Sequence, residues 1–365
     1  MQRYWERPIP FQNTKFPLYP DACGECHKDQ HENWKDSLHS RAVGPGLLGQ
    51  LGKDFKSVPT NPESSMSCYF CHAPMTEQAE VKTGAMGKGQ GASNYIKNQS
   101  FDNRLKLSGV SCSVCHLRKG KVYGPQKREV RSQKSEVRNK RQNAHDGFIE
   151  KAFFEKAEFC AACHQLDEGY ELNGKVLTNT YREWKESIYG KNNVTCQNCH
   201  MPDRQHLWRG IHNPEMVKKG ITIDAVREGK KAKIVITNTG VGHYFPTYTT
   251  PIVVVKGYMQ DNNGSAIPES VKVRYIGRRV SLDLSNEFFD TRISPQGKFE
   301  FTYEIKKLYN KNKSVFEVWV YPDDFYNRFY KELLKGDDKN LNRKEIEEAL
   351  KITEESGYQL FRENL

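Results

Sequence analysis

The sequence predicts short α-helices and loops over residues 1–215, an antiparallel β-sandwich of immunoglobulin-like type over residues 216–323, and a helical tail over residues 324–365. Three observations support this prediction. A Cys-x-x-Cys-His motif recurs through the first part, and β-branched segments separated by turn residues fill the second. An amphipathic pattern around residues 343–355 marks the tail. The recurring motif determines the chemistry that we expect of the chain.

The motif occurs five times, at Cys23–His27, Cys68–His72, Cys112–His116, Cys160–His164 and Cys196–His200. Cys-x-x-Cys-His is the attachment motif of c-type haem, because its two thiols add to the porphyrin vinyl groups and the adjacent imidazole binds the iron. The attaching residues would be Cys23, Cys26, Cys68, Cys71, Cys112, Cys115, Cys160, Cys163, Cys196 and Cys199. The proximal iron ligands would be His27, His72, His116, His164 and His200.

Other uses of paired cysteines fit this pattern poorly. All ten cysteines belong to the five motifs, and a chance His after each pair has odds on the order of 10⁻⁸. Structural zinc needs four ligands, usually from two paired units, and leaves the repeated His unexplained. Thioredoxin-type motifs occur singly beside a βαβ pattern. We therefore expect five covalent haem c groups and a multihaem cytochrome fold, with short helices and loops wrapped around a haem row.

The composition agrees with bound haem. The apolar fraction is 36% and the mean hydropathy is −0.80, so the peptide alone is poorly equipped for a large core, which the apolar porphyrins can supply. The formal net charge of +11 would ordinarily suggest a nucleic-acid partner. About ten haem propionates would offset this charge, and we therefore expect no nucleic-acid partner.

The expected location is outside the cytoplasm, either periplasmic or at the cell surface. No run of 18 or more apolar residues exists, so we expect no membrane span. Residues 1–8 contain no hydrophobic signal region, although c-type haem is attached outside the cytoplasmic membrane. We expect a mature chain whose signal peptide is absent.

Local patterns predict the elements between the motifs. Residues 28–39 predict one helix, with Trp34 and Leu38 on one face, and the Gly-, Pro- and Ser-rich residues 43–65 predict a loop. The basic residues 117–143 are interpreted as a solvated loop or as a surface for an acidic partner or propionates. Helices are also predicted over 148–163 and 178–189, the latter capped by Thr178 or Asn179.

The second part of the chain reads as a series of strands. Alternating patterns predict strands at residues 221–226, 232–238, 252–259, 271–280, 298–305 and 315–321. Turn signals lie at Asn262–Gly264 and Pro295–Gly297. This number of short strands fits an immunoglobulin-like sandwich, although the disulfide and Trp signature of antibody domains is missing.

The sixth iron ligand determines what each haem can do. A second His gives a closed electron-transfer haem, whereas an open position permits substrate chemistry. Six histidines lie outside the motifs: His31, His39, His145, His206, His212 and His243. His31 is the least suited, because it follows His27 by four residues and shares its helical face. His243 in the segment Gly240–Thr247 is either part of a strained turn or a ligand that joins the β-domain to the haem row.

Several segments resemble a large family of extracytoplasmic multihaem c-type cytochromes: Phe159–His164, Asn179–Trp184, Cys196–Pro202, His206–His212, Trp34–His39 and His243–Thr247 with its preceding Gly242. This family is related to the tetrahaem cytochromes of nitrifiers and to cytochromes that polymerise as extracellular nanowires. The similarity covers most of residues 20–330. The resemblance implies distal ligand roles for His39, His145, His206, His212 and His243. The nanowire-forming members carry four haems, often without such a β-domain.

We therefore expect electron transfer through five bis-His haems rather than enzyme activity. Expected partners are other redox proteins and copies of the same chain, including a filament in which a haem ligand is donated in trans. The rival hypothesis is a multihaem reductase of nitrite, hydroxylamine or a sulfur oxyanion, which needs one open haem. Pentahaem nitrite reductases use a Cys-x-x-Cys-Lys motif, and the sequence has none. A periplasmic shuttle that serves a separate reductase is a third alternative.

Overall fold

The computed structural model describes residues 17–51, 62–83, 95–126, 145, 147–309 and 312–365. The chain divides into two compact units. The first contains the described parts of Met1–Cys163 together with Thr195–Trp208 and Asp337–Ala349. The second contains His164–Val194, the described parts of Arg209–Gly336, and Leu350–Leu365. The predicted boundaries at residues 215 and 323 remain a prediction.

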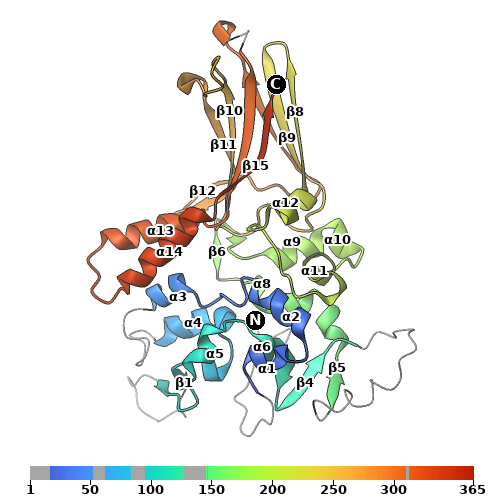
Figure 1. Ribbon diagram of the computed structural model, residues 1–365, viewed down its shortest axis with the longest axis vertical. Coiled ribbons are helices and arrows are strands. Elements are labelled where there is room, and N and C mark those ends of the chain that lie inside the picture. Colours follow the sequence, from blue (N-terminus) through green and yellow to red (C-terminus); the bar gives the residue numbers. More distant parts are fainter. Residues whose placement is uncertain (1–16, 52–61, 84–94, 127–144, 146, 310–311) are drawn as a thin grey trace. The chain divides into compact units, whose positions relative to one another are not determined.

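The first unit consists of short elements. Its helices are α1 (Pro20–Gly24), α2 (Lys28–Lys35), α3 (Pro45–Gln50), α4 (Pro62–His72), α5 (Asn103–Leu107), α6 (Cys112–His116), α8 (Glu158–His164, whose last residue belongs to the second unit) and α11 (Cys196–His200). Its strands are β1 (Val81–Thr83), β2 (Tyr95–Lys97), β3 (Leu117–Arg118), β4 (Lys121–Gly124) and β5 (Phe148–Glu150). Figure 1 shows where most of these helices and strands lie.

Two local predictions for this unit were wrong in detail, and a third lies largely outside the described residues. The helix predicted over 28–39 ends at Lys35, and Leu38 is 52% exposed instead of sharing the buried face of Trp34. The predicted loop 43–65 contains α3 and the beginning of α4, and Pro occupies the first helical position of α3, where its missing N–H has no consequence. Residues 127–143 of the basic segment lie outside the described residues.

The predicted helix 148–163 is divided into three elements. Residues 148–150 form β5, which pairs in parallel with β4, and residues 152–155 form a 3₁₀ helix. Only α8 remains of the predicted helix. Tertiary strand pairing here outweighs the local helical pattern.

The described apolar side chains of the first unit pack in small clusters. One cluster joins Tyr69 of α4 and the following Ala73 to Val43, Leu48 and Ala79. A second joins Met75 and Leu105 to Val114 of the third motif. The fully buried Gln78 ties these parts together, because its amide donates to the carbonyls of Leu105 (2.8 Å) and Gly109 (2.7 Å). Small clusters are what the low apolar fraction led us to expect.

The second unit begins with a β-hairpin and two short helices. The hairpin consists of β6 (Glu171–Leu172) and β7 (Lys175–Val176) and precedes α9 (Thr180–Glu186) and α10 (Ile188–Lys191). A single helix was predicted over 178–189, but Ser187 interrupts it, because its hydroxyl accepts the N–H groups of Tyr189 and Gly190 and so caps α10. Asn179 takes the N-cap position of α9 without a side-chain cap bond.

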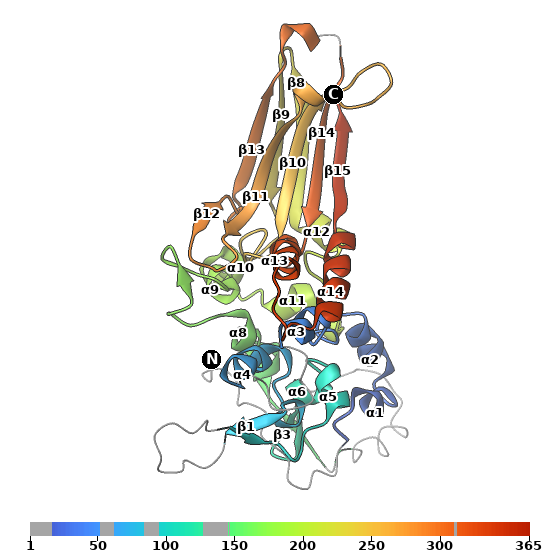
Figure 2. The same ribbon diagram turned by 90° about the vertical axis from the view of Figure 1, so that its left-hand side faces the viewer.

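Two antiparallel sheets follow α12 (Pro214–Gly220). The three-stranded sheet has the order β13–β9–β8, with β8 at Ile221–Glu228, β9 at Lys231–Asn238 and β13 at Lys298–Glu304. The five-stranded sheet has the order β12–β11–β10–β14–β15, with strands at Glu287–Asp290, Lys272–Val280, Ile252–Met259, Ser314–Tyr321 and Tyr358–Asn364. Figure 2 shows β10, β14 and β15 side by side. All six predicted strands are present, whereas β12 and β15 were not predicted.

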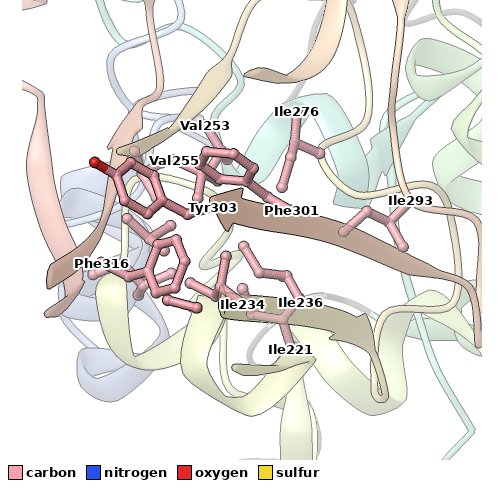
Figure 3. Packing of buried hydrophobic residues seen from close by; sticks show 14 of the residues in the cluster. Ile221, Ile234, Ile236, Val253, Val255, Ile276, Ile293, Phe301, Tyr303 and Phe316 are labelled. Carbon is pink, nitrogen blue, oxygen red and sulfur yellow. The ribbon is translucent and has the colours of Figure 1, made fainter. Parts of the chain in front are cut away.

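The two sheets share one hydrophobic core. Alternate residues of β9 (Ala232, Ile234 and Ile236) are fully buried, and they lie in one cluster with Val253 and Val255 of β10. Figure 3 shows Phe301, Tyr303 and Phe316 among these aliphatic side chains. Each fully buried large apolar side chain contributes about 1.5–3 kcal/mol. The period-two alternation in the sequence therefore corresponds to the side chains that face this shared core.

The predicted helical tail is only partly helical. Residues 324–335 and 343–355 form α13 and α14, and the second of these matches the predicted amphipathic segment. Residues 358–364 instead form β15, which pairs with β14 and contributes Leu360 to the core. Pairing with the edge of β14 and burial of Leu360 explain this strand. Within the described chain, no helix has both the length and the apolar character that crossing a membrane requires.

Candidate haem-binding sites

Each Cys-x-x-Cys-His motif lies on or beside a helical turn. The second and fourth motifs end α4 and α8, and the third and fifth form α6 and α11. In the first motif the turn is continued beyond α1 by hydrogen bonds from Cys26 N (3.3 Å) and His27 N (2.9 Å) to the carbonyl of Cys23. Residues three and four apart share one face of a helix. The two thiols and the imidazole of each motif can therefore serve a single porphyrin.

The proximal imidazoles are oriented through Nδ1. His72 Nδ1 lies 2.7 Å from the carbonyl of Ala42, and His116 Nδ1 lies 2.8 Å from the carbonyl of Tyr123. A carbonyl only accepts hydrogen bonds, so each Nδ1 carries the proton and each Nε2 keeps the lone pair that a metal requires. These residues therefore fit the role of iron ligands.

His164 has a different Nδ1 partner. The phenol oxygen of Tyr248 lies 2.5 Å from Nδ1, and the two ring centres are 6.3 Å apart. Tyr248 follows β9 in a loop of the second unit and has a left-handed backbone, with φ at 67°. Nothing in the sequence pattern singled out Tyr248. The structure thus adds a contact to the proximal histidine of the fourth motif.

His27 and His145 face each other at a separation suited to one iron. Their ring centres are 6.0 Å apart, with an interplanar angle of 33°. A metal–imidazole bond is about 2 Å long and the ring centre lies about 1 Å beyond the nitrogen, so two imidazoles on opposite sides of one metal have centres about 6 Å apart. The structure therefore brings the proximal histidine of the first motif together with a predicted distal ligand.

His116 and His206 form a second pair of this kind. Their ring centres lie 6.2 Å apart, with an interplanar angle of 31°. His206 Nδ1 is 2.9 Å from the carbonyl of Arg204, and its backbone N–H donates to Asn33 of α2. Burial lowers the pKa of His116 to about 4 and also lowers the pKa of His206. Both rings are therefore neutral at pH 7, which is the form that binds metal.

Trp208 contacts two of the predicted distal ligands. The centre of its indole ring lies 4.7 Å from the ring centre of His39 and 4.9 Å from the ring centre of His206. In both pairs the rings meet in an edge-to-face arrangement. Its backbone N–H donates to the carbonyl of His200, the proximal residue of the fifth motif (3.0 Å). The left-handed backbone of Trp208, with φ at 41°, places the indole in this position. Trp208 thus links two predicted distal ligands with the proximal residue of the fifth motif.

His212 differs from the other predicted ligands. Its Nε2 lies 3.0 and 3.1 Å from the two carboxylate oxygens of Asp323. The ring nitrogen that binds iron in most haem proteins is therefore engaged by a carboxylate here. A ligand role for His212 remains a prediction.

The segment Gly242–Thr247 is held against α9. Glu183 accepts the backbone N–H of Tyr244 (3.1 Å) and the hydroxyl of Thr247 (3.4 Å), and Thr180 contacts Thr247 at 2.8 Å. His243 Nδ1 lies 2.9 Å from the carbonyl of Tyr244. With Nδ1 protonated, Nε2 carries the lone pair, as in His72, and this is the tautomer that a ligand role of His243 requires.

His31 packs against the first motif. A Cβ atom on Gly24 would lie 2.7 Å from Cγ of His31, so only glycine fits at this position. The imidazole stacks on Trp34 with ring centres 5.7 Å apart and lies 3.3 Å from a carboxylate oxygen of Asp21. These contacts give His31 a packing role, in agreement with its low rank among the candidates.

Cysteines of different motifs lie in pairs. Cys23 and Cys112 share a hydrogen bond that lowers the pKa of Cys23 and raises that of Cys112. Cys160 and Cys196 share another, which raises the pKa of Cys160 and lowers that of Cys196. The first motif is thus adjacent to the third, and the fourth is adjacent to the fifth.

Comparisons with known proteins identify cytochromes that are similar to this chain. A family model described as cytochrome c554 and c-prime matches residues 22–117. Cytochrome c-552 of Aliarcobacter butzleri is 23% identical over 198 residues, which cover 54% of this chain and 37% of that protein. Cytochrome c-554 of Nitrosomonas europaea is 25% identical over 169 residues, which cover 45% of this chain and 62% of that protein. The chain thus spans less than two thirds of each relative.

A solved structure resembles nearly the whole chain. The penta-heme cytochrome c552 from Thermochromatium tepidum matches with a TM-score of 0.63 and 17% sequence identity, over 96% of this chain and all of that chain. This likeness shows the fold. The family match over residues 22–117, the two relatives and this fold agree with the multihaem c-type cytochrome that the repeated motifs predict.

Proposed function

We propose that this protein is an electron carrier with five covalently bound haem c groups, most or all of them ligated by two histidines. The observation that carries the proposal is the pairing of His27 with His145 and of His116 with His206, at ring separations of 6.0 and 6.2 Å. Bound haem supplies one-electron exchange between ferric and ferrous iron. A second imidazole closes the sixth position and leaves no site for a substrate.

The remaining distal positions have candidates. His39 is oriented by Trp208, and His243 by the carbonyl of Tyr244. One further ligand comes from His212 or is donated in trans by a second copy of the chain. Ligation in trans would make the ligand bond itself an assembly contact, as expected for a filament.

The adjacent motifs support an electron path that does not follow sequence order. The contact between Cys23 and Cys112 places the first motif beside the third. Cys160 contacts Cys196 and also interacts electrostatically with Cys115, so the third motif lies near the fourth and fifth. Short distances between neighbouring haem groups favour electron transfer. The third motif would accordingly occupy a central position in the path.

The β-domain supports the immunoglobulin-like assignment. Its five-stranded sheet has the order β12–β11–β10–β14–β15, which corresponds to the C″–C′–C–F–G sheet of variable-type domains, and its other sheet joins β8, β9 and β13.

We further propose an extracytoplasmic location, in the periplasm or at the cell surface, because haem c is attached there. Other redox proteins, and copies of this chain, are the proposed partners.

Haem quantification and spectroscopy of the purified protein test the proposal. The pyridine haemochrome assay should give five haems per chain, and electron paramagnetic resonance of the oxidised protein should show low-spin bis-His signals for at least four. Fewer than five haems, or a majority of high-spin iron, would refute it. One high-spin haem that reacts with nitrite or hydroxylamine would instead favour the multihaem reductase. Electron microscopy and size-exclusion chromatography of the same sample test filament formation.

A further inference from the structure

Three charged or polar side chains form a closed cluster inside the first unit. Lys106 donates to the hydroxyl oxygen of Tyr69 at 2.7 Å and forms an ion pair with Glu80, and the hydroxyl of Tyr69 donates to the second carboxylate oxygen of Glu80 at 2.9 Å. The exposed fractions are 0% for Lys106, 1% for Tyr69 and 4% for Glu80. This ion pair is therefore removed from water almost completely.

Burial of this kind is not explained by stability alone. Desolvation of two charges offsets much of their attraction, and replacement of a buried ion pair by apolar residues is often neutral or stabilising. Burial lowers the pKa of Lys106, although Glu80 opposes the shift, and burial together with Glu80 raises the pKa of Tyr69 well above its usual value. The cluster therefore places two opposed charges in a medium where each exerts a strong electric field.

The cluster is attached to the second haem-binding motif. Tyr69 lies between Cys68 and Cys71, the two residues that would bind the porphyrin. It belongs to α4, which ends at His72. Only the side chain of Tyr69 therefore separates the charged groups of Glu80 and Lys106 from the helical turn that carries the second motif.

Hydrogen bonds also hold the backbone around Lys106 and Glu80 in place. Lys106 belongs to α5, whose N-terminus is capped by the carboxylate of Asp102, and Asp102 N–H donates to the carbonyl of Glu77 (2.8 Å). Gln78 ties the carbonyls of Leu105 and Gly109 to the segment that precedes Glu80. Because the backbone on both sides is held in this way, the positions of the two charges relative to the second motif are set by the fold.

We propose that the buried Tyr69–Glu80–Lys106 cluster is an electrostatic element that fixes the reduction potential of the haem attached to Cys68 and Cys71. This inference rests on the proposed electron-transfer function. In the intact cluster the two charges nearly cancel. A remaining positive charge would favour ferrous over ferric iron and raise the potential, whereas a remaining negative charge would lower it.

Two isosteric substitutions test the proposal. Glu80→Gln leaves Lys106 unpaired, and Lys106→Met leaves Glu80 unpaired. Redox titrations of the full-length holoprotein between pH 6 and 9, followed by electron paramagnetic resonance, should show one of five components shifted in opposite directions. We expect the upward shift in Glu80→Gln to be largest at low pH, where Lys106 is charged, because burial lowers the pKa of Lys106.

Tyr69, Glu80 and Lys106 contact one another. Burial, Glu80 and Cys68 raise the pKa of Tyr69, and a thioether at Cys68 does not titrate. Haem propionates make the potential pH-dependent in every form of the protein, so the quantity to compare is the change in pH dependence between Glu80→Gln and the unmodified protein, which reports the charge of Lys106.

Two controls separate electrostatics from packing. Tyr69→Phe removes two hydrogen bonds but no charge, so it should lower the unfolding temperature and leave all five potentials near their original values. The double variant Lys106→Met with Glu80→Gln should return the shifted component to its original position. Shifts of equal sign in the two single variants, or unchanged potentials at both ends of the pH range, would overturn the inference. Haem content and spin state, measured on every variant, test the proposed function separately.

Discussion

The imidazole rings of His27 and His145 lie with their centres 6.0 Å apart, which is the spacing expected for two ligands of one iron. His27 follows the first pair of cysteines, whereas His145 is separated from any motif in the sequence. The fold thus places beside His27 a predicted distal ligand that no local pattern defines.

Replacement of His145 by alanine should convert one of the five haems to a high-spin form. The reason is that the sixth position of the first site loses its imidazole, while the remaining sites keep theirs. Electron paramagnetic resonance should show a new high-spin signal near one fifth of total iron, and added imidazole should remove it. His31→Gln is the matched control, because His31 packs on the same motif through Gly24. The ligand assignment fails if His145→Ala retains five low-spin haems.

Replacement of His212 by glutamine should leave the spin state of all haems unchanged. Its Nε2 is engaged by Asp323, which holds the ring in a carboxylate contact. Glutamine keeps a hydrogen-bond donor for this carboxylate. An unchanged spectrum would mean that the fifth distal ligand comes from another source, which favours ligation in trans. A high-spin signal in this variant would restore His212 as a ligand of its own chain.

Sequence reasoning was most effective where chemistry requires fixed local spacing. The thiols and imidazole of one motif must reach one porphyrin, so Cys68, Cys71 and His72 are recognisable without a structure. The strands were similarly predictable, because burial of one sheet face imposes alternation, as at Ile234 and Ile236.

The less predictable features depend on contacts between distant segments. No local periodicity distinguishes Trp208 or Tyr248 from the other aromatic residues of the sequence, yet each contacts a predicted ligand. The strand at residues 358–364 exists because β14 offers an unpaired edge. Lys106 would ordinarily be placed on a helix surface, and only the opposed carboxylate of Glu80 accounts for its burial.

Replacement of Tyr248 by phenylalanine should raise the reduction potential of the haem attached to Cys160 and Cys163. The phenol oxygen accepts the Nδ1–H of His164 at 2.5 Å, and such an acceptor increases the basicity of the ligand and favours ferric iron. Redox titration should show one of five components shifted upward, with the haem content unchanged. Tyr170→Phe is a suitable control, because Tyr170 is 53% exposed and belongs to the same unit. A downward shift, or none, would contradict this role.

The second unit should lose stability in acid through Asp290. Burial alone raises its pKa, but hydrogen bonds from Arg292 and Lys175, both at 2.9 Å, lower the pKa to about 2. Because this is below the ordinary value of 3.8, the folded state gains stability that is fully present above about pH 4 and disappears as the pH falls through about 2. The shift corresponds to roughly 2 kcal/mol. Burial raises the pKa of the nearby Glu183, whose contribution has the opposite sign.

Replacement of Asp290 by asparagine should lower the unfolding temperature at pH 7 and flatten its dependence on pH between 4 and 2. Thermal unfolding of the holoprotein, followed by far-ultraviolet circular dichroism at several pH values, measures both effects. Glu300→Gln provides a matched control: the pKa of Glu300 is also lowered to about 2, but its partners Lys233 and Lys298 lie at the surface, where water and salt screen the attraction. If the two variants lose equal stability, burial of the Asp290 contacts adds nothing. A larger loss for Asp290→Asn would indicate that the ion pairs of Asp290 help to hold the hairpin of β6 and β7 to the sheet edge at β12, since Lys175 and Asp290 come from these two elements.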